Sequence, residues 1–176
     1  VKNIFETSGF EIIDVIPQET HGGSMRYVLC KKGVRKVSQN VINLFNTEKD
    51  LGLDKRSTYQ KFKVNCELSK EKIISKLKKF KNEGKKIVGY GATSKSTTIL
   101  NYCKIGPELI DFISDTTPIK QNKYTPGMHI PVKPHDHFLT QKPEIAVLFA
   151  WNHKKEIENK EKKFIENGGK FISHIS

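Results

Sequence analysis

The sequence predicts an α/β protein whose C-terminal half is built around a parallel β-sheet. From residue 87 onward, short apolar runs alternate with segments of helical periodicity. The runs "IVGY" and "IAVLFAW" are apolar at nearly every consecutive position, which is typical of parallel strands covered on both faces. Since such strands are joined by right-handed helical crossovers, we expect this half to be Rossmann-like in the broad sense.

The first 33 residues predict the end of a helix followed by a β-hairpin. Gly9 is expected to end the helix, and strands are expected over residues 11–16 and 25–30. The glycine-rich stretch "HGGS" at 21–24 would connect the two strands, and Gly33 would end the second.

Residues 34–86 predict a helical connecting segment. Two apolar stripes with helical spacing occur there, and such a stripe is ordinarily the face that packs on a core. The second helix is expected to begin near Ser69. The stripes consist of Val41, Leu44, Phe45 and Glu48 in the first helix and of Ile73, Ile74, Leu77 and Phe80 in the second.

Residues 87–176 are expected to form one nucleotide-binding domain. Its predicted order is the strand "KKIVGYGA", the helix "SKSTTILNYCKI", the strand "LIDFISD", a long loop, the strand "EIAVLFAW", one helix closed by two glycines, and the strand "KFISHI". The loop covers residues 116–138 and ends in "PHDHF", which we interpret as a surface turn. The histidines have no spacing typical of metal ligands, so no metal site is expected.

Composition narrows the class of partner. The chain has 176 residues and a formal charge of +12, but Arg26, Arg35 and Arg56 are its only arginines. Base reading and bidentate phosphate recognition favour arginine, so we expect solvated lysine faces and anionic small ligands in place of nucleic acid.

Cysteine usage and hydropathy bear on location. Cys30, Cys66 and Cys103 are isolated, with no spacing typical of a disulfide framework or a zinc site. No apolar run is long enough to span a bilayer, and the N-terminus does not have the layout of a signal peptide. These features favour a reducing, cytoplasmic location without membrane binding.

The stretch "GYGATSKST", residues 89–97, nearly matches two phosphate-binding patterns. A P-loop requires a second glycine where Ser94 stands, although Gly89, Lys95 and Ser96 align. A dinucleotide fingerprint requires a glycine at the same position, although Gly89 and Gly91 fit. An ATPase or kinase is therefore disfavoured.

Three interpretations of this stretch stay open. Asp115, at the end of the next strand, lies near where an acid would bind a ribose hydroxyl, so a dinucleotide remains possible. A helix N-terminus with Ser94 as its cap and Lys95 in its first turn would suit a diphosphate. With equal weight, Gly89 and Gly91 only allow a strand to turn tightly into a helix.

Four motifs in order carry a resemblance to a known family. "GFEIIDVIPQETHGGSMRYVL", "GYGATSKSTTILNY", "SDTTPIKQNKYTPGMHIPV" and "FAWNHKKEI" together resemble the C-terminal region of the sugar C-methyltransferases. Those enzymes use S-adenosylmethionine and act on keto sugars attached to nucleoside diphosphates. The resemblance spans almost the whole chain.

The resemblance implies a division of labour with an upstream methyltransferase domain. Residues 1–33 would be the terminal helix and hairpin of that class I methyltransferase domain, residues 34–86 a helical linker, and residues 87–176 a Rossmann-like domain. S-adenosylmethionine would be bound mainly upstream, so no cofactor is expected for this chain alone. The chain alone would not methylate a substrate.

The resemblance also implies site residues. His21 would act as the general base, preceded by Thr20 where some members carry an acid. Ser24 and Arg26 would steady the enolate or the hairpin, with a salt bridge favoured for Arg26. The substrate nucleotide would be bound by Tyr90, Gly91, Lys95, Lys120, Tyr124, Trp151 and Asn152, although Trp151 is equally compatible with core packing.

Two other classes of function are alternatives. The chain could be a stand-alone nucleotide or NAD(P)-binding module without catalysis. It could also be an interdomain or oligomerisation scaffold. From the residues alone, an exposed hairpin turn explains His21 better than catalysis does.

Overall fold

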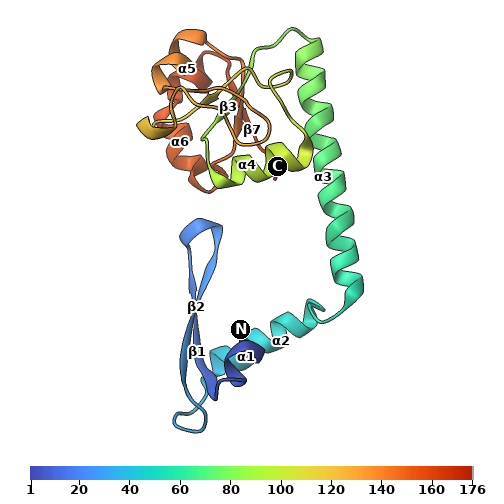
Figure 1. Cartoon of the computed structure of the whole chain (residues 1–176), viewed down its shortest axis with the longest axis vertical. Coiled ribbons are helices and arrows are strands. Elements are labelled where there is room, and N and C mark those ends of the chain that lie inside the picture. The colour runs from blue at the N-terminus through green and yellow to red at the C-terminus, as the bar shows by residue number, and fades with distance from the viewer. Residues whose placement is uncertain (176) are drawn as a thin grey trace. The chain divides into compact units, whose positions relative to one another are not determined.

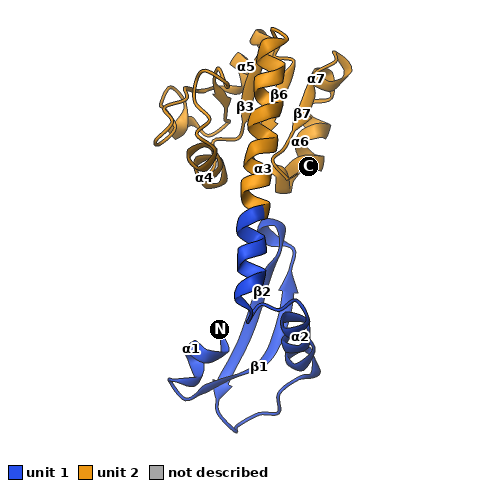
Figure 2. Cartoon of the chain, turned by 90° about the vertical axis from the view of Figure 1, so that its right-hand side faces the viewer, with its two compact units in different colours: residues 1–64 blue, residues 65–176 orange. Residues whose placement is uncertain are grey.

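The computed structural model describes residues 1–175 (Figure 1). The chain divides into two compact units, residues 1–64 and residues 65 onward (Figure 2).

The first unit contains an antiparallel hairpin with a helix before and a helix after it. The hairpin prediction is confirmed, because β1 and β2 pair from Phe10 with Lys31 to Gln18 with Ser24. Gly9 follows the first helix with a φ of 76°. The elements are α1 (Lys2–Glu6), β1 (Phe10–Gln18), the 3-10 turn η1 (Thr20–Gly22), β2 (Ser24–Lys31) and α2 (Gln39–Asp50).

Asp14 fastens α2 to the hairpin. Its Oδ1 accepts hydrogen bonds from Ser38 Oγ at 2.6 Å and from Asn40 Nδ2 at 3.1 Å. These bonds lower the pKa of the Asp14 carboxyl, because they favour its charged form. Beside this contact, Ile12, Val15 and Val41 form a small buried core.

The long helix α3 (Arg56–Asn82) crosses the boundary between the two units. It begins well before Ser69, so the predicted start was wrong. Residues 56–68 contain neither glycine nor proline and continue the helix. Ile73 and Leu77 on the predicted stripe are buried in the core of the second unit.

The second unit is a five-stranded parallel sheet in the order β5-β4-β3-β6-β7. The first strand, β3, is central. The next two, β4 and β5, extend the sheet to one edge, and β6 and β7 then extend it to the other edge. Counted from β3, this is the 3-2-1-4-5 order of doubly wound nucleotide-binding sheets. The strands are β3 (Ile87–Tyr90), β4 (Ile113–Ser114), β5 (Val132–Lys133), β6 (Ile145–Leu148) and β7 (Lys170–Ile172).

Helices cover both faces of this sheet, which confirms the predicted α/β class. On one face, α3 and α4 pack on a cluster that includes Ile87, Ile113 and Ile145. On the other face, α5, α6 and α7 pack on a cluster that includes Val88 and Leu148. The helices and 3-10 turns are α4 (Ser94–Cys103), η2 (Pro118–Lys120), α5 (His135–Gln141), η3 (Trp151–His153), α6 (Lys154–Lys160) and α7 (Lys162–Glu166).

The predicted loop over residues 116–138 is only partly a loop. Val132–Lys133 form the edge strand β5, and Pro134 is the N-cap of α5. Phe138 is 1% exposed in the core, so the interpretation of "PHDHF" as a surface turn was wrong.

The predicted single helix before the last strand is interrupted at Glu161. This residue separates α6 from α7 and is 3% exposed. Its carboxylate accepts a hydrogen bond from Tyr90 at 2.7 Å and lies 2.6 Å from His135 Nε2. The helix breaks where its glutamate turns inward to these partners.

Candidate functional site

A cavity of about 470 Å3 lies at the carboxyl ends of the central strands in the second unit. Residues after β3, β4 and β6 line it, together with one face of α6. Its lining includes Gly91, Thr93, Asp115, Lys120 and Lys160. The connection after β3 runs to one edge of the sheet, and the connection after β6 runs to the other. Ligands bind at this position in open α/β sheets.

Gly89 within β3 and Gly91 in the turn that follows have packing roles. A Cβ on Gly89 would lie 2.7 Å from Ile113 Cγ1 and 3.0 Å from a ring carbon of Phe149. Gly91 has a φ of 92°, and a Cβ there would lie 3.3 Å from the Cβ of Ala150. The geometry of this turn therefore requires both glycines without any ligand.

Internal acceptors already take most amides of the same turn. The Ala92 N–H donates to Asp115 Oδ2 at 2.7 Å. Thr93 is the N-cap of α4 and forms a reciprocal capping box with Ser96. Ser94 is the first helical residue, so its prediction as the cap was wrong. Within residues 1–175, the amides of Ser94 and Lys95 are the ones left without an acceptor at this helix start.

Asp115 is a buried carboxylate at the centre of the cavity lining. Its Oδ1 accepts the Thr117 N–H at 2.8 Å, and Lys120 Nζ lies 3.4 Å from Oδ2. Burial alone would raise the pKa of this carboxyl, but the hydrogen bonds from Thr117 and Ala92 and the charge of Lys120 outweigh burial and lower it. Asp115 is therefore held as an anion that faces the turn.

Tyr90 is 7% exposed, and it connects the cavity wall to the buried polar group around Glu161. Burial, and then the hydrogen bond to Glu161, raise the pKa of the Tyr90 phenol. Its hydroxyl is committed to Glu161, so the ring is the part of Tyr90 that can contact a ligand.

Three more of the predicted residues, Lys95, Trp151 and Asn152, form one contact group that is not part of the cavity lining. Lys95 Nζ donates to Asn152 Oδ1 at 2.8 Å and lies 4.7 Å from the centre of the Trp151 ring. The group joins the first turn of α4 to η3 after β6. Trp151 is half-buried, outside the apolar clusters, which sets aside its interpretation as a core aromatic.

The two residues of the "KQNKYTPG" loop are separated from each other. Lys120 lines the cavity. Tyr124 is 66% exposed and forms an isolated bridge with Pro131, away from the cavity lining.

His21 lies in the first unit, at the tip of the hairpin. It is exposed and has a φ of 58°, followed by Gly22 at 87° and Gly23 at 119°. A left-handed backbone at a non-glycine residue is uncommon and clusters at functional sites. Ser24 Oγ donates to the Thr20 carbonyl at 3.2 Å, which steadies the tip. Among the described residues, Arg26 makes no ion pair, so its favoured salt bridge does not form within this part of the chain.

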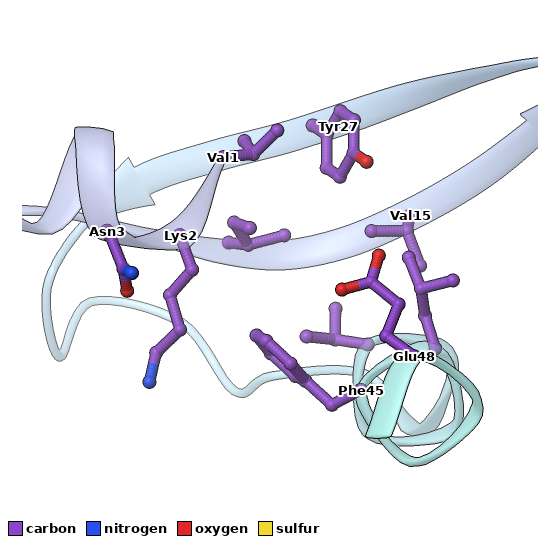
Figure 3. A pocket seen from close by; sticks show the side chains of 10 residues that line it. Val1, Lys2, Asn3, Val15, Tyr27, Phe45 and Glu48 are labelled. Atoms are coloured by element: carbon purple, nitrogen blue, oxygen red, sulfur yellow. The ribbon is translucent and has the colours of Figure 1, made fainter. Parts of the chain in front are cut away.

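The first unit also contains a cavity of about 190 Å3 between the hairpin, α1 and α2. Figure 3 shows Val15 and Tyr27 on the strands and Phe45 on α2 around the same space. Lys2 and Glu48 are among its lining residues. The cavity is a gap in the small core of this unit.

Sequence analysis missed several cavity residues, namely Thr93, Thr116, Thr117, His153, Glu156 and Lys160. Their position just after predicted strands was the available signal for the threonines. His153 in η3 and the two residues on α6 had no such signal, and only the fold brings them to the cavity.

In the described part of the chain, no three metal-binding side chains gather as a metal site would require. No helix within residues 1–175 combines the length and apolar character needed to cross a membrane.

Comparison with known proteins agrees with this arrangement. The family described as "C-methyltransferase C-terminal domain" matches residues 19–176. C-methyltransferase NovU of Streptomyces niveus is 34% identical over 173 residues, and the alignment covers 98% of this chain and 41% of that protein. The chain thus spans less than half the length of this curated relative, and it belongs to the C-methyltransferase C-terminal domain family.

Proposed function

We propose that the chain is the substrate-binding C-terminal portion of an S-adenosylmethionine-dependent C-methyltransferase that acts on a nucleoside-diphosphate keto sugar. The observation that carries the proposal is the cavity at the carboxyl ends of β3, β4 and β6 in a chain of this family. Polar groups that converge in such a cavity favour a nucleotide-like ligand.

In this proposal His21 removes a proton. Methylation of a carbon next to a ketone begins when a base takes the α-proton and leaves an enolate. A neutral imidazole suits that step near neutral pH. The exposed hairpin tip and the left-handed backbone of His21 support the assignment, because the ring can approach a ligand from the solvent side.

S-adenosylmethionine supplies the methyl group in this reaction class. The β3–α4 turn does not fit that cofactor, because internal acceptors take the Ala92 and Thr93 amides. We therefore place the cofactor in a part of the full-length protein outside this chain, and we assign this chain no cofactor.

The first unit supports a further part of the proposal, namely that residues 1–33 complete an upstream methyltransferase domain. A two-stranded hairpin is marginally stable by itself. Large apolar side chains of this unit remain exposed, including Ile4 at 70% and Val34 at 67%. A reducing, cytoplasmic location is part of the same proposal and agrees with three free cysteines.

Thermal unfolding of the 176-residue chain tests the binding function. A pyrimidine nucleoside diphosphate or its sugar should raise the melting temperature, while NAD and ATP should not. Stabilisation by NAD alone would instead support a dinucleotide-binding module. No response to any of them, with an oligomer that depends on concentration, would support a scaffold.

His21→Asn in the full-length enzyme tests the catalytic role. Loss of a general base should lower turnover by about 10²- to 10⁴-fold with little change in nucleotide affinity. Turnover close to that of the unaltered enzyme would contradict the assignment.

A further inference from the structure

We infer that Asp115 acts as an internal anion at the β3–α4 turn, so that the phosphate groups of the ligand bind to Lys120 and Lys160 and not to the turn. This inference rests on the proposed function for the nucleotide part of the ligand. In this arrangement, lysine side chains of the cavity bind the negative charge of the ligand, and the turn does not.

Acceptors within the protein already occupy amides of the β3–α4 turn. In dinucleotide-binding sheets, phosphates approach the amides between the first strand and its helix. Here Asp115 Oδ2 already accepts the Ala92 N–H at 2.7 Å, and the capping box takes the amides of Thr93 and Ser96. The carboxylate takes the position that an incoming phosphate oxygen would need.

The negative charge of Asp115 also acts on any phosphate that approaches the turn. Asp115 is 8% exposed, so water screens its charge poorly. Its hydrogen bonds lower its pKa, and it stays ionised at neutral pH. A phosphate placed on the remaining amides of Ser94 and Lys95 would lie close to this charge and be repelled. The turn therefore disfavours phosphate although a helix begins there.

Two lysines, Lys120 and Lys160, line the cavity. A histidine, His153, and two acids, Asp115 and Glu156, line it with them. Lys120 pairs with Asp115 at 3.4 Å, and His153 pairs with Glu156 at 3.4 Å. Among the described residues, Lys160 has no acidic partner within 4 Å, so its charge is available to a ligand.

Lys120 can serve the ligand and Asp115 together. An ammonium group has three donors, and only one is directed to the carboxylate at 3.4 Å. Its side chain is 41% exposed, so it can reach into the cavity. A diphosphate bound by Lys120 and Lys160 would have lysine ammonium groups as its donors in place of the turn amides.

The same arrangement explains a specificity. An acid at the end of the second strand binds a ribose hydroxyl in NAD-binding sheets. Asp115 stands at that position but is committed to Ala92 and Thr117. The cavity consequently offers a dinucleotide neither the open turn nor the free acid after the second strand that NAD-binding sheets use.

Calorimetric titration of the 176-residue chain with inorganic pyrophosphate tests the inference. Lys160→Gln and Lys120→Gln should each weaken binding about tenfold, because each removes a cation that contacts the ligand. Lys163→Gln on α7 removes the same charge outside the cavity lining and should change affinity much less. Asp115→Asn should strengthen binding about tenfold, because it removes the repelling charge.

The outcomes separate this inference from the proposed function. Lysine variants without effect, or weaker binding by Asp115→Asn, would overturn the inference, as would no binding of pyrophosphate by any variant. Lys120→Gln and Lys160→Gln keep the test valid if Asp115→Asn does not fold. If pyrophosphate behaves as expected but no nucleoside-diphosphate sugar binds, the inference stands and the proposed function fails. If a nucleotide sugar binds but pyrophosphate does not, the reverse holds.

Discussion

The phenolic hydroxyl of Tyr90 donates a 2.7 Å hydrogen bond to the buried carboxylate of Glu161. This bond joins the last residue of β3 to the break between α6 and α7, and His135 completes the group at 2.6 Å. Through it, a residue of the cavity wall is fixed to the helices that cover its own face of the sheet.

Tyr90→Phe should lower the free energy of unfolding by about 1–3 kcal/mol, because it removes one partner of a buried charge. Urea unfolding measures the change. Tyr102→Phe is the matched control, since Tyr102 also donates to a glutamate, Glu67 at 2.6 Å, but on the surface. Its effect should be clearly smaller. Equal effects would contradict the importance of the buried position.

Gly91→Ala should destabilise the chain by about 1–3 kcal/mol, because it combines a left-handed φ with a close contact. The contact is the 3.3 Å approach to the Cβ of Ala150. Gly168→Ala is the control, since Gly168 has a φ of 87° and no atom within 4 Å of an added Cβ. A smaller loss at Gly168 isolates the contribution of the contact, and identical losses would show that only φ matters.

His21→Gly should raise the free energy of unfolding by up to about 1 kcal/mol, because glycine adopts the φ of 58° without strain. The same variant should abolish turnover in the full-length enzyme. His129→Gly, at a φ of 53° in the second unit, should give a similar gain without loss of turnover. A His21→Gly enzyme that keeps its activity would make His21 a simple turn residue.

Stability should decrease in mild acid because of His174. Burial lowers the pKa of this imidazole from its usual 6.5, and Nδ1 has no partner among the described residues. Below pH 6.5 the unfolded chain therefore binds the proton more readily than the folded chain, and the free energy of unfolding falls as pH falls. Urea unfolding at pH 7.5 and 5.5 measures the slope. His174→Gln should flatten it, and an unchanged slope would assign the loss to other groups.

Trp151 provides an optical signal, because it is the only tryptophan in the chain. Its ring lies under the Lys95 ammonium at 4.7 Å, and its neighbour in the chain, Ala150, lines the cavity. A bound nucleoside-diphosphate sugar should change its fluorescence in a saturable way. Lys95→Met should alter the starting fluorescence by removing the cation. Binding seen by calorimetry without a fluorescence change would place the ligand away from η3.

The parallel sheet was predictable because β3 and β6 are continuous apolar runs, and because β4 and β7 lie in the apolar segments "LIDFISD" and "KFISHI". The edge strand β5 was not, since its two residues stand between Pro131 and Pro134, and proline is typical of loops. Glu161 lies in a lysine-rich segment that reads as a solvated face, and only Tyr90 and His135 from elsewhere in the chain explain its burial.

Part of the cavity lining could be named from the sequence. Gly91 and Lys120 line the cavity, and their contact with a ligand stays a prediction. The partners of Asp115 could not be foreseen, because the Ala92 amide approaches it only when β3 and β4 lie side by side. Residues on α6 carry no motif, and the crossover of the chain alone brings them to the cavity.

The closed turn after β3 also has a kinetic consequence. Asp115 and the capping box order this loop when the chain folds, so its conformational entropy is already lost before a ligand arrives. We expect association to require no rearrangement of that segment, and the positive charge of the chain to assist the encounter with an anionic ligand.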